Sequence, residues 1–303
     1  MEPKWEELGE LEFEPSSCPV CGGEHYRERF QKRLLGRSMR YVNCLSCDTL
    51  FANPRATEDT LRRIYASQSF FEGKEDNINY YSFLAGEKYL SRTAQSRLSR
   101  IRKFAKGNNL LEVASAAGFF LNQAKRQGFR VQGVEFSRPM ARYASERWDV
   151  PVLAESIEQV DLPQGEFDVI AGWGVFTILR DPLAALKKFR GALKPGGVLA
   201  LNTYYHDGIW CRLWGANWYI LVLNTSQIFS RATLRRVLRD SGFDIVSIRR
   251  DRPYASVKYA AFQLLSHVPG SVKNRYFERF HFLNSLVFPV FAPDNYEYIC
   301  VKR

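Results

Sequence analysis

Four of the six cysteines fall in two closely spaced pairs near the N-terminus. Cys18 and Cys21 form one Cys-x2-Cys pair, and Cys44 and Cys47 form the other. Each pair places two sulfurs on one knuckle, and two knuckles supply the tetrahedral four-sulfur shell that zinc prefers. A thioredoxin-type redox site would instead need one pair beside a βαβ unit. We therefore predict a structural zinc ribbon, whose four sulfur ligands leave no open position for catalysis.

A bend of small residues, followed by an acidic residue, indicates a second candidate functional site. Glu112 opens the bend, which runs to Gly118, and its small side chains let the backbone approach a ligand closely. Glu135 follows at the end of the next predicted strand. A carboxylate in that position accepts both hydroxyl protons of a ribose. Bend and acid together indicate a nucleoside-binding site.

The elements that must position these residues alternate along the chain. Strands are expected at 110–113, 130–135, 151–154, 167–172, 198–203, 243–249 and 296–302, and helices at 119–125, 139–148, 182–193 and 230–241. Strands alternating with helices of this length form βαβ crossovers, which predicts an α/β fold with a mostly parallel sheet and helices on both faces. Ligands of such a sheet bind beyond the carboxyl ends of its strands.

Composition and charge narrow the class of protein. The 303 residues are 46% hydrophobic and 25% charged, a globular balance that excludes a disordered chain or a collagen. The acidic N-terminus lacks an apolar run, and no apolar stretch approaches the roughly 20 residues of a spanning helix, so a cytoplasmic chain is expected. The net charge of +11 is concentrated in basic runs at 27–40 and 88–106. Such runs attract phosphate, although a solvated helix face explains the second run at least as well.

Several segments resemble the motifs of class I S-adenosylmethionine-dependent methyltransferases. The bend and acid of 110–137 resemble the first two motifs, and the exit from the cysteine pairs, 47–54, is similar to that of a subgroup with an N-terminal four-cysteine zinc ribbon. Later matches lie at 167–170, 181–182, 193–197, 218, 229–230, 234 and 241–243. The resemblance implies a Rossmann-like, seven-stranded, mostly parallel sheet whose last strand is antiparallel.

The resemblance also implies S-adenosylmethionine as cofactor and assigns its contacts by position. Glu112 would approach the methionine amino group and Glu135 the ribose hydroxyls, while Phe136 and the loop at 155–156 would contact the adenine and Trp173 would flank the methionine. The full set of residues implied is Glu112, Ala114, Ser115, Ala116, Gly118, Glu135, Phe136, Glu155, Ser156 and Trp173. Ala114 and Ala116 stand where the family usually has glycine.

The two histidines familiar in the subgroup are absent, since Thr177-Ile178 and Thr225 occupy their positions. Tyr204, Tyr205 and His206 follow the fifth strand, at the rim where an acceptor would sit, and are the candidate catalytic residues. His206 has the intrinsic pKa of a general base near neutrality, although a hydrogen-bonded loop histidine is the plainer interpretation. Methyl transfer gains mostly from proximity, so a base is required only for weak nucleophiles.

These features divide the chain into three parts. Residues 1–56 hold the zinc ribbon and an acidic N-terminal tail, 57–106 a helical linker or cap, and 107–303 the methyltransferase domain with an insertion at about 251–295. The insertion is rich in aromatic and basic residues, which fits a lid over an apolar pocket, a peripheral membrane contact or a plain packing helix pair.

Three functions are consistent with the sequence. The first is methyl transfer to a small-molecule acceptor of the sugar-nucleotide, surface-polysaccharide or secondary-metabolite type. The second is an RNA methyltransferase whose basic ribbon grips phosphates. The third is an inactive methyltransferase-like binding module whose altered bend no longer holds the cofactor. The sequence does not indicate an oligomeric state.

Overall fold

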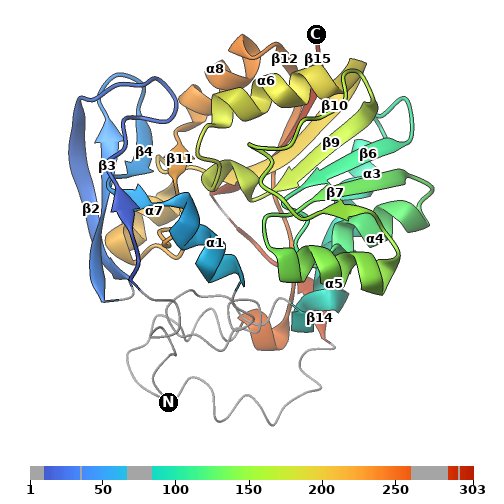
Figure 1. Ribbon diagram of the computed structural model, residues 1–303, viewed down its shortest axis with the longest axis horizontal. Coiled ribbons are helices and arrows are strands. Elements are labelled where there is room, and N and C mark those ends of the chain that lie inside the picture. Colours follow the sequence, from blue (N-terminus) through green and yellow to red (C-terminus); the bar gives the residue numbers. More distant parts are fainter. Residues whose placement is uncertain (1–9, 35, 67–83, 261–285, 293) are drawn as a thin grey trace.

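The computed structural model describes residues 10–34, 36–66, 84–260, 286–292 and 294–303 (Figure 1). Its centre is a seven-stranded sheet in the order β12-β15-β10-β9-β6-β7-β8. The strands are β6 (Asn109–Val113), β7 (Arg130–Val134), β8 (Val152–Leu153), β9 (Phe167–Trp173), β10 (Leu193–Tyr204), β12 (Phe243–Arg250) and β15 (Asn295–Lys302). All neighbours are parallel except β15, which is antiparallel to both β10 and β12. The predicted fold class is confirmed.

Helices cover both faces of this sheet, because neighbouring residues of each strand point to opposite sides. Leu110 and Val169 pack with residues of α3 (Glu87–Ile101) and α4 (Phe119–Arg126). Leu111 and Ile170, one residue further, pack with α6 (Pro182–Ala192) and α8 (Arg231–Asp240). α5 (Arg138–Trp148) begins at Ser137, whose side chain accepts a hydrogen bond from the backbone N–H of Met140.

The cysteine ribbon is part of a four-stranded sheet in the order β11-β4-β3-β2. β2 (Tyr26–Leu34), β3 (Arg37–Cys44) and β4 (Thr49–Ala52) come from the N-terminal part, but β11 is Gln227–Phe229. β11 pairs antiparallel with β4. β2 and β3 form an antiparallel hairpin, and a strand about 180 residues further along the chain completes its sheet.

The remaining elements connect these two sheets. β1 (Phe13–Glu14) pairs with β5 (Arg55–Ala56), and α1 (Glu58–Ala66) follows, lying between the ribbon sheet and the large sheet (Figure 1). Short turns of helix occur at η2 (Leu84–Gly86), η3 (Val175–Thr177), α7 (Ile209–Trp214) and η4 (Gly215–Asn217). None of the described helices has the length and hydropathy of a membrane span.

Only the two ends of the predicted insertion fall within the described residues. β13 (Tyr254–Ser256) and β14 (Val287–Pro289) pair antiparallel there. Most of the aromatic and basic residues that suggested a lid or a membrane contact belong to 261–285, outside the described residues.

Much of the basic charge serves the fold. In the second run, Arg97 and Arg100 of α3 are ion-paired with the buried carboxylates of Asp251 and Glu297 at 2.5 Å. In the first run, Arg29 and Lys32 are engaged with residues 206–221. Arg29 and Lys32 of the first run are therefore bound to other parts of the chain.

Candidate functional site

A cavity of about 510 Å³ lies at the carboxyl ends of β6, β7, β9 and β10. Of the ten residues that the resemblance implies for the cofactor, all except Gly118 line it. Gly118 instead begins α4 at a φ of 73°, and a Cβ there would lie 2.8 Å from that of Ala144. It therefore permits helix packing, and its predicted place in the cavity wall is wrong.

The bend after β6 owes its shape to two alanines in the left-handed region. Ala114 has a φ of 56° and Ala116 a φ of 46°. This turn directs the N–H of Ala116 at Glu135, which accepts it at 2.7 Å and accepts the N–H of Ser137 at 2.8 Å. Burial raises the pKa of Glu135, and these amides act in the opposite direction. The carboxylate is thus fixed in orientation at the cavity wall.

Four buried polar atoms of wall residues have no hydrogen-bond partner among the described residues. They are Arg97 Nε, Glu112 Oε2, Ser115 Oγ and Trp173 Nε1. Burial raises the pKa of Glu112 well above its usual range, and the guanidinium of Arg97 only partly offsets this. Unpaired buried polar atoms cost free energy unless a ligand pairs with them. The wall is therefore suited to a ligand with hydrogen-bonding groups at this depth.

The end of the cavity near Phe136 is closed by α1. The Tyr65 ring meets Phe136 edge-on with centroids 5.6 Å apart, and the guanidinium of Arg62 lies 4.8 Å from the centre of the Phe136 ring. Arg62 also donates a hydrogen bond to Glu155 at 2.8 Å, which lowers the pKa of that carboxyl. Tyr65 and Arg62 were not predicted from the sequence, because α1 carries no motif.

The opposite end of the cavity is aromatic. Tyr204 meets Tyr219 edge-on at 5.9 Å, and Tyr89 stacks on Tyr259 at 5.5 Å. All four line the cavity. Burial raises the pKa values of Tyr204 and Tyr219, so both phenols are neutral near pH 7. Of these residues only Tyr204 was predicted from the sequence.

The other two catalytic candidates do not lie in the cavity wall. His206 is 1% exposed; its Nδ1 accepts from Arg29 at 2.7 Å, and its Nε2 donates to the Asp48 carbonyl at 2.8 Å. Burial lowers its pKa, which leaves a neutral imidazole that joins the ribbon to β10. Tyr205 is buried against Tyr298. Placing His206 and Tyr205 at an acceptor rim was wrong, because the chain turns away from the cavity after Tyr204.

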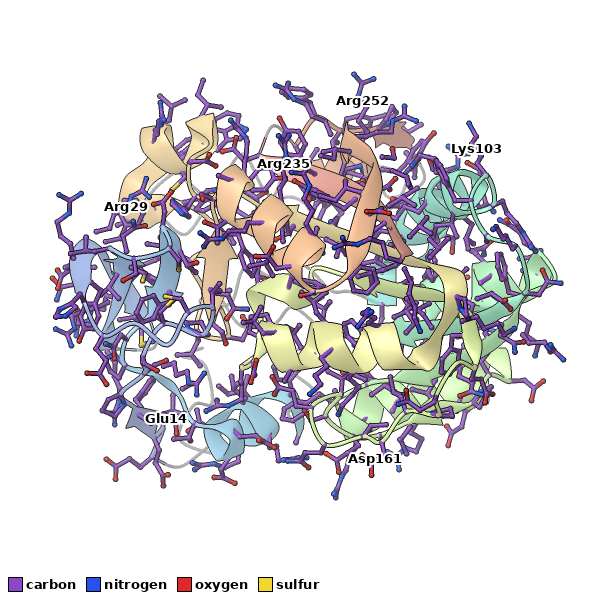
Figure 2. All side chains as sticks on the ribbon, turned by 90° about the horizontal axis from the view of Figure 1, so that it is seen from above. Glu14, Arg29, Lys103, Asp161, Arg235 and Arg252 are labelled. Carbon is purple, nitrogen blue, oxygen red and sulfur yellow. The ribbon has the colours of Figure 1, made fainter. Side chains whose placement is uncertain are left out.

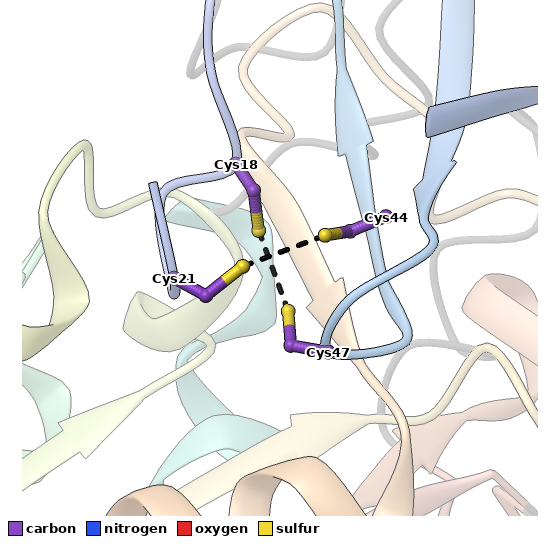
Figure 3. A group of neighbouring side chains, drawn as sticks. All are labelled: Cys18, Cys21, Cys44 and Cys47. Atoms are coloured by element: carbon purple, nitrogen blue, oxygen red, sulfur yellow. Dashed lines mark hydrogen bonds between the residues drawn. The ribbon is translucent and has the colours of Figure 1, made fainter. Parts of the chain in front are cut away.

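The four paired cysteines converge on one point (Figure 3). Their sulfurs all lie within 4.8 Å of one another, with Cys18 to Cys47 and Cys21 to Cys44 at 3.5 Å. A tetrahedral zinc with Zn–S distances of about 2.3 Å separates its sulfurs by about 3.8 Å. The hydrogen bond from Cys18 lowers the pKa of Cys47, while the same contact raises that of Cys18. The donor set and its geometry thus fit a metal dication.

Comparison with known proteins identifies the class. A family model described as a methyltransferase domain matches residues 87–248. The chain belongs to this family and is a class I S-adenosylmethionine-dependent methyltransferase. Its fold is also that of a SAM-dependent methyltransferase from Archaeoglobus fulgidus, with a TM-score of 0.51, 20% identity, and coverage of 74% of this chain and 100% of that one.

Two curated relatives match shorter stretches. The tRNA U34 carboxymethyltransferase of Syntrophotalea carbinolica is 33% identical over 109 residues, which are 34% of this chain and 34% of the relative. The uncharacterized methyltransferase YdaC of Bacillus subtilis is 29% identical over 102 residues, 32% of this chain and 56% of the relative. The chain thus spans about a third and about half of the length of these relatives.

A first prediction concerns the strained bend. Ala116→Gly should raise the free energy of unfolding by about 0.5–1 kcal/mol, because relief of a left-handed alanine outweighs the added freedom of the unfolded chain. Urea unfolding measures the change. Ala117→Gly is the matched control: Ala117 is buried and has no positive φ, so its replacement should destabilise the chain. An equal decrease in the free energy of unfolding of both variants would show that the bend stores no strain.

Proposed function

We propose that the chain transfers the methyl group of S-adenosylmethionine to a small-molecule acceptor held at the aromatic end of the cavity. The observation that carries this proposal is the continuity of one cavity. One end offers the hydrogen-bonding groups that suit a nucleoside and an amino acid, and the other offers buried tyrosine rings.

At the first end, Glu135 keeps lone pairs for two ribose hydroxyls beyond the two amide bonds that orient it. Phe136 and Tyr65 offer apolar ring surface for an adenine. Glu112 would pair with an ammonium group, which offsets the cost of its burial. When bound, S-adenosylmethionine supplies an electrophilic methyl group on its sulfonium.

At the second end, the wall selects against a highly charged acceptor. Among the described lining residues, Arg97 is a cation whose charge acts on Tyr204, and it is already paired with Asp251. Ring surfaces of Tyr89, Tyr204 and Tyr219 favour a flat or apolar group, and phenol O–H groups can donate hydrogen bonds to orient it. The residues then contribute by excluding water and by holding the acceptor in line with the sulfonium.

Glu135→Gln should weaken binding of S-adenosylhomocysteine roughly 10- to 100-fold, because it removes a charge-assisted hydrogen bond to the ribose. Isothermal titration calorimetry measures the loss. Glu146→Gln, on the exposed surface of α5, should bind as the unchanged chain does. Equal affinity in both variants would refute the assigned role of Glu135.

The cysteine cluster supports a structural zinc site held by Cys18, Cys21, Cys44 and Cys47. We expect about one zinc ion per purified chain, and Cys44→Ser should lose the metal and unfold the ribbon first, because metal binding supplies folding free energy. Elemental analysis by mass spectrometry with a thermal melt checks both. Cys300→Ser, outside the cluster, should keep its zinc. A folded chain without metal would contradict the assignment.

An RNA acceptor is the second candidate, favoured by the tRNA-modifying relative and by one basic face. The packing of α8 on β12 gathers exposed arginines, and Figure 2 shows Arg235 and Arg252 on the side opposite Glu14 and Asp161. β12 runs parallel to β10, so its carboxyl end leads to Pro253 and Tyr254 in the cavity wall. The exposed arginines on α8, on β12 and directly after β12 are Arg235, Arg236, Arg239, Arg249, Arg250 and Arg252.

This candidate predicts tRNA binding that weakens steeply as salt is added, since each phosphate contact releases a counterion. Arg235→Glu combined with Arg252→Glu should reduce both the affinity and the salt slope in a filter-binding assay. Arg126→Glu, exposed on α4, is the charge-matched control. Absent or salt-insensitive binding would exclude RNA and leave the small-molecule proposal.

A further inference from the structure

The wall at the aromatic end has little regular structure of its own. We call residues 204–225 the acceptor wall; those that line the cavity are Tyr204, Tyr219, Ile220, Val222, Asn224 and Thr225. Between β10 and β11 this segment contains only the short helices α7 and η4. Its internal hydrogen bonds are those of short turns, such as the bond from the N–H of Leu221 to the carbonyl of Trp218 at 3.1 Å, and no strand or long helix holds it together. Its conformation therefore depends in part on its neighbours.

Lys32, on β2 of the ribbon sheet, supplies a central part of that support. Its Nζ donates to the carbonyl of Leu221 at 2.9 Å and to that of Trp218 at 3.2 Å. These residues flank Tyr219 and Ile220, so the ammonium spans the stretch that faces the cavity. Lys32 is half-buried, and this burial lowers its pKa to about 8.

Other ribbon residues support the same segment at both ends. The hydroxyl of Tyr41 donates to the Val222 carbonyl at 2.9 Å. The N–H of Ala52 donates to the Ser226 carbonyl at 3.0 Å. At the start of the wall, Arg29 donates to the carbonyl of His206 at 3.1 Å.

The nucleoside end of the cavity is built differently. Its bend and acid, 112–118 and 135–137, are positioned by β6, β7 and α1. Among the described residues, no hydrogen bond joins these two segments to ribbon residues 17–53. Loosening the ribbon contacts should therefore affect the two ends of the cavity unequally.

We propose that Lys32 is a positioning residue of the acceptor site, through which the ribbon sheet fixes the acceptor wall while the cofactor end keeps its own support. This inference rests on the proposed function, which places the acceptor at the aromatic end. It also assigns Lys32 a role that its place in a basic run does not suggest.

Lys32→Met tests the proposal, because it keeps the length of the side chain and removes the ammonium. We expect backbone amides of 218–225 to exchange with deuterium roughly tenfold faster, with S-adenosylhomocysteine affinity within twofold of the unchanged chain. The tryptophan emission of the chain, to which the buried Trp218 contributes, should shift to longer wavelength. Arg33→Met replaces the exposed neighbour of Lys32 and should change neither the exchange rates nor the emission nor the cofactor affinity. Lys32→Arg keeps the positive charge and should show exchange rates between those of Lys32→Met and the unchanged chain.

Unchanged exchange at 218–225 in Lys32→Met, with cofactor binding intact, would overturn the proposal and leave the proposed function standing. Failure of the unchanged chain to bind S-adenosylhomocysteine would instead overturn the proposed function. If Lys32→Met does not fold, Tyr41→Phe removes a single hydrogen bond to the same wall and should give a smaller change in the same direction. No change there would also contradict the proposal.

Discussion

The site depends on the burial of two carboxylates in one cavity. Glu112 lies near the carboxyl end of β6 and Glu135 follows the adjacent parallel strand β7; they are 3% and 4% exposed. Burying an ionised carboxylate costs several kcal/mol unless hydrogen bonds or a countercharge replace its water. For Glu135, two backbone N–H groups take the place of water. One of them is the N–H of Ala116, and the bend that directs it at the carboxylate holds Ala114 and Ala116 at positive φ.

For Glu112, the compensation spreads through several elements. The countercharge that acts on it is Arg97 of α3, whose guanidinium also lies 4.1 Å from the centre of the Trp173 ring. Arg97 is held by Asp251 just beyond β12, and Asp251 accepts a second hydrogen bond from Asn202 of β10. Residues 57–106 were predicted to form a helical linker or cap, but α3 packs as part of the helical layer on the large sheet. The family match begins at residue 87, which is also the first residue of α3.

The predictable part of the structure is the part encoded by local pattern. Apolar runs and small-residue turns predicted the sheet, and strand ends predicted Glu112 and Glu135, because both features depend on residues close in sequence. Lys32 and β11 could not be predicted in the same way. Their partners lie more than 170 residues away, and a lysine on a strand has the same sequence signature whether it meets water or two buried carbonyls. His206 was misplaced because a strand's end does not reveal which way the chain turns next.

The arrangement of titratable groups also restricts the chemistry of the acceptor. None of the described residues that line the cavity is a histidine, and burial keeps the phenols of Tyr204 and Tyr219 protonated. Glu135 is committed to backbone amides, and Glu112 would be committed to an ammonium. The other lining carboxylates are also paired, Glu58 and Glu155 with Arg62 and Glu158 with the backbone amides of residues 180 and 181. Among the described residues of this wall, no carboxylate or imidazole is therefore free to remove a proton before methyl transfer. The rate must come mainly from proximity and alignment, which suffices for an acceptor that brings its own good nucleophile, such as a neutral amine or a readily ionised oxygen, sulfur or carbon acid.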